Sequence, residues 1–143
     1  MKRPAAALIV AMAVWPAAAR AEAPPAPPVT VTPLASATST ASGQPIGFPA
    51  GPGRVVVAEY VIAPGARLPV HRHPYPRIGY VLQGTLEVVE ERTGRVFSYK
   101  PGDVIVEVIG AAHFGRNTGS DPVRLVVFDT TPADVEGNVT LEK

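Results

Sequence analysis

Residues 65–84, GARLPVHRHPYPRIGYVLQG, join a histidine pair to a β-strand pattern between two glycines. His71 and His73 are separated by one residue, so in an extended segment both imidazoles point to the same side, close enough to bind one ion. Residues 77–82 are rich in β-branched and aromatic side chains and end at a Gln-Gly turn, which favours a strand. The stretch therefore predicts an extended segment that carries a candidate metal-binding pair.

Short apolar runs alternate with turn residues on both sides of this stretch. We predict further strands over residues 55–62, 85–91, 96–99, 104–109 and 123–129. Turns recur about every 8–12 residues, and nothing beyond residue 21 shows a helical period over three turns. This pattern is typical of an all-β sandwich or barrel.

His113 is the third and last histidine of the chain. It follows a predicted hairpin, on a segment that can return beside the first pair, and neutral imidazole is the commonest metal ligand in proteins. Two interpretations are open on the residues alone. Either the three imidazoles bind one ion, or His71 and His73 form a surface pair unrelated to His113.

The glycines and the other motif residues favour the first interpretation. The spacing of residues 65–84 resembles the first cupin motif, G(x)5HxH(x)3–4E(x)6G, in the form Gly65-(x5)-His71-x-His73-(x3)-Arg77-(x6)-Gly84. The spacing of residues 102–117 resembles the second, G(x)5PxG(x)2H(x)3N, in the form Gly102-(x5)-Val108-x-Gly110-(x2)-His113-(x3)-Asn117. With the flanking strands, the resemblance covers residues 50–132.

The resemblance implies a small antiparallel jelly-roll β-barrel with a metal pocket inside it, and a homodimer. It implies His71, His73 and His113 as ligands of one divalent transition metal. Arg77 stands where the family usually has a glutamate as fourth ligand, and Arg cannot ligate. Three neutral histidines would leave the ion its full charge, and losing the oxygen donor disfavours manganese relative to iron, nickel, copper or zinc.

Two further residues are candidates for binding a small molecule. Arg77 facing the pocket would lie beside a dication, an arrangement that a bridging anion relieves, so we expect a small anionic ligand. The alternative is that Arg77 turns outward to a surface acid and leaves the site weak or empty. Tyr75, in the loop His-Pro-Tyr-Pro, either closes over the pocket mouth or anchors the loop.

Length and composition exclude several functions. The chain has 143 residues, which suits one domain, and its lack of cysteine excludes disulfides, thiol nucleophiles and Cys-ligated metal. A net charge of +1 and 6% aromatic residues give no basis for binding nucleic acid.

The amino terminus indicates export. Residues 1–21 have a charged start, an apolar run broken by Pro16 and a small-x-small cleavage site, which predicts a signal peptide and no membrane span after processing. The mature chain would start at Glu22, carry a net charge of 10 − 12 = −2, and be periplasmic or secreted. Residues 22–49 are a Pro/Ala/Ser/Thr-rich linker or edge segment, residues 50–132 the barrel, and residues 133–143 a C-terminal tail.

The sequence thus favours an exported single-domain cupin that acts on or binds a small anionic molecule through a three-histidine metal site. As an enzyme it would be a metal-dependent oxygenase, isomerase or hydrolase, with no catalytic residue assigned. The alternative is a non-catalytic protein, either one that binds metal or a small ligand, or a dimeric structural cupin with a degenerate site.

Overall fold

The computed structural model describes residues 28–143. The predicted signal peptide, residues 1–21, lies outside these residues. Residues 32–143 form one compact unit. Within the described part of the chain there is no helix with the length and apolarity needed to cross a membrane.

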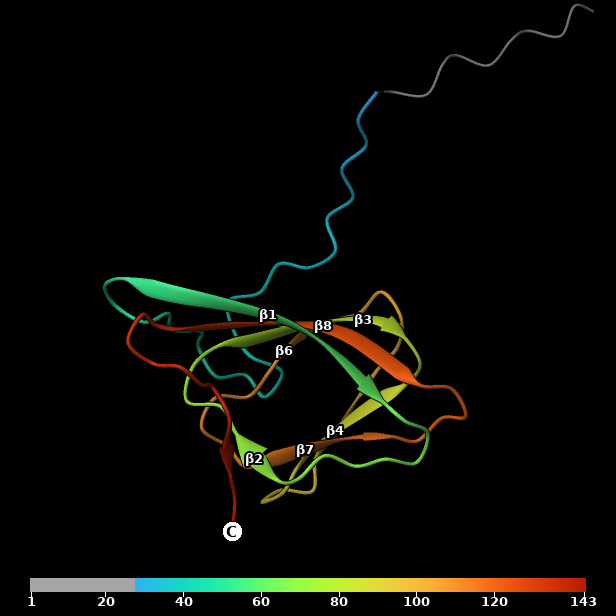
Figure 1. Ribbon diagram of the computed structural model, residues 1–143. Coiled ribbons are helices and arrows are strands. Elements are labelled where there is room, and N and C mark those ends of the chain that lie inside the picture. The colour runs from blue at the N-terminus through green and yellow to red at the C-terminus, as the bar shows by residue number, and fades with distance from the viewer. Residues whose placement is uncertain (1–27) are drawn as a thin grey trace, which may run out of the picture. The chain divides into compact units, whose positions relative to one another are not determined.

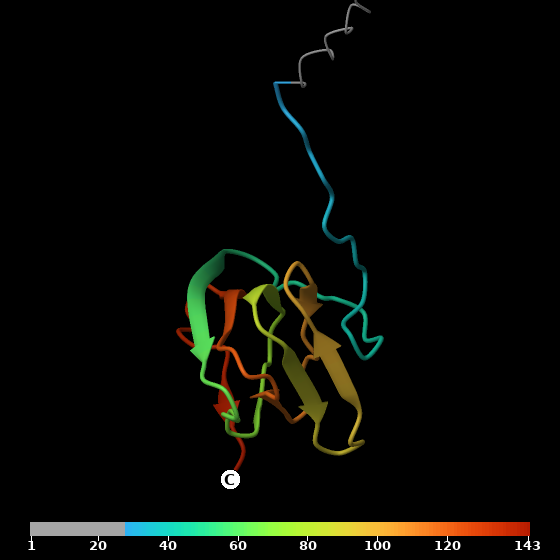
Figure 2. The same cartoon turned by 90° about the vertical axis from the view of Figure 1, so that its right-hand side faces the viewer.

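The described chain is all-β, which confirms the predicted fold class. Its strands are β1 (Gly53–Ile62), β2 (His71–Arg72), β3 (Arg77–Gln83), β4 (Leu86–Glu90), β5 (Val96–Tyr99), β6 (Val104–Val106), β7 (His113–Asn117), β8 (Val123–Pro132) and β9 (Thr140–Leu141). They form a sheet of order β1-β8-β3-β6 and a second of order β5-β4-β7-β2-β9, which face each other (Figures 1 and 2). All strand pairs are antiparallel, as in a jelly roll.

The apolar core lies between the two sheets. Alternation along β8 places Val123, Leu125 and Val127 on its inner face, each at most 4% exposed. The core is completed from the other strands by Ile62, Val81, Leu86, Val88 and Ile105.

Three strands were not predicted from the sequence. β2 and β9 are two residues long, too short to produce a pattern, and β7 (HFGRN) lacks the β-branched residues that mark strands. The predicted strand 104–109 ends at Val106. The missing strands all belong to the sheet that carries the histidines, so the sequence left the surroundings of the site least defined.

The segment before β1 lies along the edge strand β6. The backbone N–H of Ala41 donates to Val106, and the side chain of Gln44 both accepts from the N–H of Ile109 and donates to its carbonyl. This part of residues 22–49 therefore covers the edge of the first sheet.

Gly84 turns the chain from one sheet to the other, between β3 and β4. Its φ of +77° lies in the left-handed region, and a Cβ there would be 2.7 Å from the carbonyl oxygen of Pro122 and 2.9 Å from Cα of Val123. Gly94 has a similar φ of +66° but no atom within 4 Å of its Cβ position.

We expect Gly84→Ala to lower the free energy of unfolding by about 3 kcal/mol or more, because backbone strain and a clash with rigid backbone add up. Gly94→Ala is the control, with backbone strain alone, about 1–2 kcal/mol. Urea unfolding followed by fluorescence measures both. Equal losses in the two variants would show that the close approach at Gly84 costs nothing.

Candidate metal centre

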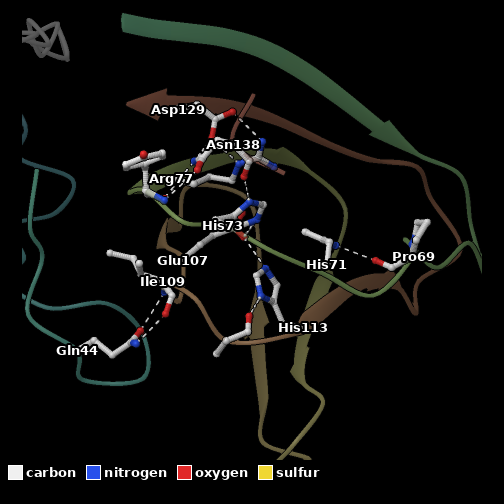
Figure 3. A network of polar contacts seen from close by, with 12 residues as sticks. Gln44, Pro69, His71, His73, Arg77, Glu107, Ile109, His113, Asp129 and Asn138 are labelled. Atoms are coloured by element: carbon white, nitrogen blue, oxygen red, sulfur yellow. Dashed lines mark hydrogen bonds and ion pairs between the residues drawn. The ribbon is translucent and has the colours of Figure 1, made fainter. Parts of the chain in front are cut away.

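Two neighbouring strands bring the three histidines together. His71 lies on β2 directly opposite His113 at the start of β7, and His73 follows β2 by one residue. The ring centroids are 4.6 Å apart for His71 and His113, 4.8 Å for His71 and His73, and 4.9 Å for His73 and His113. All three residues are buried. The structure thus places the imidazoles around one point between the sheets (Figure 3).

Each imidazole is oriented by a backbone carbonyl. Nδ1 lies 2.7 Å from the oxygen of Pro69 in His71, 2.7 Å from that of Asn138 in His73 and 2.8 Å from that of Ala111 in His113. A carbonyl only accepts, so each Nδ1 carries the proton and donates. In a neutral ring, Nε2 then carries the free lone pair, so Nε2 is the atom that can bind a metal ion.

Glu107 completes the cluster, and sequence reasoning missed it. Its Oε2 lies 3.1 Å from Nε2 of His73 and 3.1 Å from Nε2 of His113. Glu107 follows β6 directly, and its N–H donates to the carbonyl of Arg77 on β3. The carboxylate therefore comes from the cross-strand neighbour of Arg77, the position where the motif usually has its own glutamate.

A signal for Glu107 was present in the sequence. It is the only charged residue in the run VIVEVI, residues 104–109. Alternation places it on the same face as Ile105, which is 1% exposed and part of the core. A carboxylate at an inward position of an apolar strand needs a partner, whereas the motif predicts the acid at position 77.

The donor set fits a metal ion. The ligand atoms of His71, His73, Glu107 and His113 lie within 4.8 Å of one another. Nε2 of His73 is buried and has no hydrogen-bond partner in the described chain, although Oε2 of Glu107 is near it. Three imidazole lone pairs and a carboxylate directed at one point repel each other unless a cation lies between them.

This ligand set corrects two expectations. A divalent ion would share the site with one carboxylate, so the centre would carry +1 rather than +2. The oxygen donor is present as well, which removes the argument against manganese. The physical reason is the register of β3 and β6, which places Glu107 and Arg77 opposite each other.

The surroundings set the charge of these groups. Burial by itself raises the pKa of Glu107, but the contacts with His113 and His73 outweigh burial and lower that pKa below its usual range. Burial lowers the pKa of His71 and so favours its neutral form. The site therefore favours an ionised carboxylate beside His71 in the form that binds metal.

A family model with the description "Cupin domain" matches residues 58–129, half of the chain, and spans all the residues of this cluster. The chain belongs to the cupin family. No curated protein matches this cupin.

Solved structures of similar fold support the assignment. One is an uncharacterised protein with a double-stranded β-helix domain from Klebsiella pneumoniae, 26% identical, with a TM-score of 0.51 over 61% of this chain and 69% of that one. Another is an oxalate decarboxylase from Lactobacillus farciminis in complex with formate, 27% identical, with a TM-score of 0.52 over 61% of this chain and 26% of that one. A third is the DMSP lyase DddQ from Ruegeria pomeroyi, 25% identical, with a TM-score of 0.51 over 61% and 42%. This cupin thus spans less than half of either named enzyme.

Arg77 is buried and paired within the cupin. Its Nε donates to Oδ1 of Asp129 and its Nη2 donates to Oδ2, each over 2.7 Å. Asp129 lies directly opposite Arg77 on β8. Both side chains are shielded, with 7% and 13% of their surface exposed. The guanidinium therefore pairs with an internal acid rather than a surface acid, and a contact between Arg77 and a bound anion stays a prediction.

A cavity of about 30 Å³ adjoins the cluster and has largely apolar walls. His71, Glu107, His113 and Arg77 all line it, together with Tyr60. A second hollow of about 110 Å³ shares Tyr60, His71 and Arg77 with the first and includes Val139 and Leu141 near the C-terminus. Tyr75 lines neither, and its backbone N–H and carbonyl both bond to the side chain of Asn138.

We expect Glu107→Gln to weaken zinc or cobalt binding by at least about 100-fold, more than the loss of a group outside the ligand set. The side chain keeps its shape but loses the charge that a cation needs. Chelator competition measures the dissociation constant. Glu87→Gln is the control, since Glu87 pairs with Arg116 away from the cavity. Unchanged affinity in Glu107→Gln would show that the carboxylate is not a ligand.

Proposed function

We propose that this cupin binds one divalent first-row transition metal through His71, His73, Glu107 and His113, and uses it to bind or convert a small molecule. The observation that carries the proposal is the convergence of three Nε2 atoms and one carboxylate oxygen, with every Nδ1 already engaged by a carbonyl. Hydrogen bonds within the cluster do not satisfy all four donors, because Nε2 of His73 is buried without a hydrogen-bond partner.

The bound ion would supply Lewis-acid character to a ligand in the adjoining cavity. The protein supplies the shape. Apolar side chains such as Leu68 and Val127 exclude water, and the volume of about 30 Å³ has room for about two waters or a ligand of a few atoms. Tyr60 is the only cavity-lining side chain outside Arg77 and the ligand set that has an exchangeable proton, which makes its hydroxyl the candidate proton donor.

The ligand class we propose is a small carboxylate. A divalent ion with three neutral histidines and one carboxylate keeps a charge of +1, and the Arg77–Asp129 pair adds none, so an anion would neutralise the centre. The similar oxalate decarboxylase was solved with formate, which is small enough for this cavity.

Two of the similar structures are enzymes by name, which favours turnover. The second candidate function is binding without turnover. It is favoured by the lack, among the cavity-lining residues, of an acid or base other than the ligand set and Tyr60.

We further propose that the protein is exported. The support is the sequence of residues 1–21, with its charged start, apolar run and cleavage site. A periplasmic or extracellular cupin without cysteine would depend on its sheets and its bound ion for stability.

We predict that metal-free protein titrated with cobalt(II) binds one ion per chain and that the complex shows visible absorption bands. Formate should then shift these bands, because it would enter the cavity beside the ion, and His113→Ala should abolish both signals. The control is Arg67→Ala, since the Arg67 side chain lies over Phe114 and not in the cavity. Absence of cobalt binding would contradict the metal site, and binding without a formate response would contradict the carboxylate ligand alone.

We also propose that two copies of this cupin associate through β1. β1 is ten residues long and forms the edge of its sheet. Within residues 28–143 no strand pairs with its outer side, so its backbone groups can pair with a second copy. Its Val55, Val57 and Val61 are 55–65% exposed on the face away from the cavity. An antiparallel strand pair can be symmetric, as a dimer requires.

We expect Val57→Lys to convert a dimer to a monomer, because it would bring two like charges close together along the β1–β1 pair and remove apolar side chains from it. Light scattering after size-exclusion chromatography measures the mass. Val96→Lys, on the edge strand of the other sheet and 46% exposed, is the control and should remain dimeric. A monomeric wild type would contradict the association.

A further inference from the structure

The three imidazoles do not obtain their carbonyl partners in the same way. His71 and His113 each bond to the carbonyl two residues before them, at Pro69 and Ala111, so the local chain orients these rings. His73 bonds to the carbonyl of Asn138, which lies 65 residues further along the chain. The orientation of His73 therefore depends on a segment outside both cupin motifs.

The side chain of Asn138 fixes this carbonyl relative to His73. It accepts from the N–H of Tyr75 at 3.0 Å and donates to the Tyr75 carbonyl at 3.1 Å, as a neighbouring β-strand would. Its amide also donates to Oδ1 of Asp129 at 2.6 Å, the oxygen that holds Nε of Arg77. Asn138 is 4% exposed. One buried side chain thus links the loop after His73 to the Arg77–Asp129 pair (Figure 3).

The residues after Asn138 support the other side of the histidine strand. β9 pairs with β2, with Leu141 opposite His71 and Thr140 opposite Arg72. The N–H of Glu142 donates to the carbonyl of Val70, and its carboxylate pairs with Arg72. Without this segment β2 would have β7 as its only neighbour in the sheet.

We propose that Asn138 is a positioning residue of the metal centre and that residues 138–142 form a C-terminal strap that sets the orientation of His73. This inference rests on the proposed metal site and extends it to a segment that no motif contains. Asn138 touches no ligand of the ion with its side chain. It acts by holding its own carbonyl against Nδ1 of His73, so that Nε2 faces the centre.

The test compares Asn138→Ala with Thr131→Val in the full chain, with zinc as the probe. Thr131 is also buried and bonds to Val135, so its variant loses a similar hydrogen bond without contact to a histidine. Chelator competition gives the zinc affinity, and NMR gives the solvent-exchange rate of each ring Nδ1 proton, with and without zinc.

We expect Asn138→Ala to weaken zinc binding by about 10–100-fold, the usual effect of removing a group that orients a ligand. Exchange of the His73 ring proton should become faster, while those of His71 and His113, held by local carbonyls, keep their rates. Thr131→Val should change neither measurement. Equal acceleration at all three rings, or none at His73, would overturn the proposal.

Asn138→Asp serves if the alanine variant does not fold. It keeps the shape and the acceptor for Tyr75 but replaces the donor to Asp129 by a like charge, and the same selective change at His73 is expected. Failure of the wild type to bind zinc would contradict the proposed function. The ring-proton comparison in zinc-free protein would then decide the positioning role on its own.

Discussion

The fold brings four electron-pair donors to one buried point, and this constraint explains much of the structure around it. Glu107 is 11% exposed, and His73 and His113 are almost fully enclosed. An ionised carboxylate taken out of water costs several kcal/mol unless a positive charge compensates it. The only other buried cation lining the cavity, Arg77, is already paired with Asp129. A cation among these donors would supply that compensating charge, and the proposed metal site provides it.

Compared with the family motif, the acidic side chain has moved from β3 to the position after β6, and a basic side chain stands in its place on β3. The motif position for a glutamate holds Arg77, and the carboxylate comes instead from Glu107, which directly follows the neighbouring strand β6. The exchange places a guanidinium inside the barrel, and Asp129 on β8 balances it from the other side. Glu107, Asp129 and Arg77 together carry a net charge of −1, so a bound divalent ion would leave a single net positive charge.

The sequence predicted the all-β architecture and the three histidines of the four-residue cluster, but not its carboxylate. The strands of the first sheet have long β-branched runs, and the three histidines follow spacings that predict their convergence. Glu107 is marked in the sequence as a lone charge in an apolar strand, but its partners and the role of Asp129 depend on register between strands, which no local spacing records. Asn138 was missed for a similar reason, since its partners His73 and Tyr75 lie more than sixty residues away. Backbone carbonyls that orient imidazoles leave no signature in residue type at all.

The different supports of the three histidines link metal binding to folding. β2 is two residues long and pairs with β7 on one side and β9 on the other, so it forms only when distant segments have come together. An ion that binds the native arrangement and not the unfolded chain stabilises the whole barrel by mass action, by about 2.7 kcal/mol at a concentration 100 times its dissociation constant. An ion at the proposed site would also relieve the repulsion among Glu107 and the three Nε2 lone pairs. At the proposed metal site, binding and folding would be coupled most strongly at β2. This two-residue strand carries His71, directly precedes His73, and depends on β7 and β9 for its pairing.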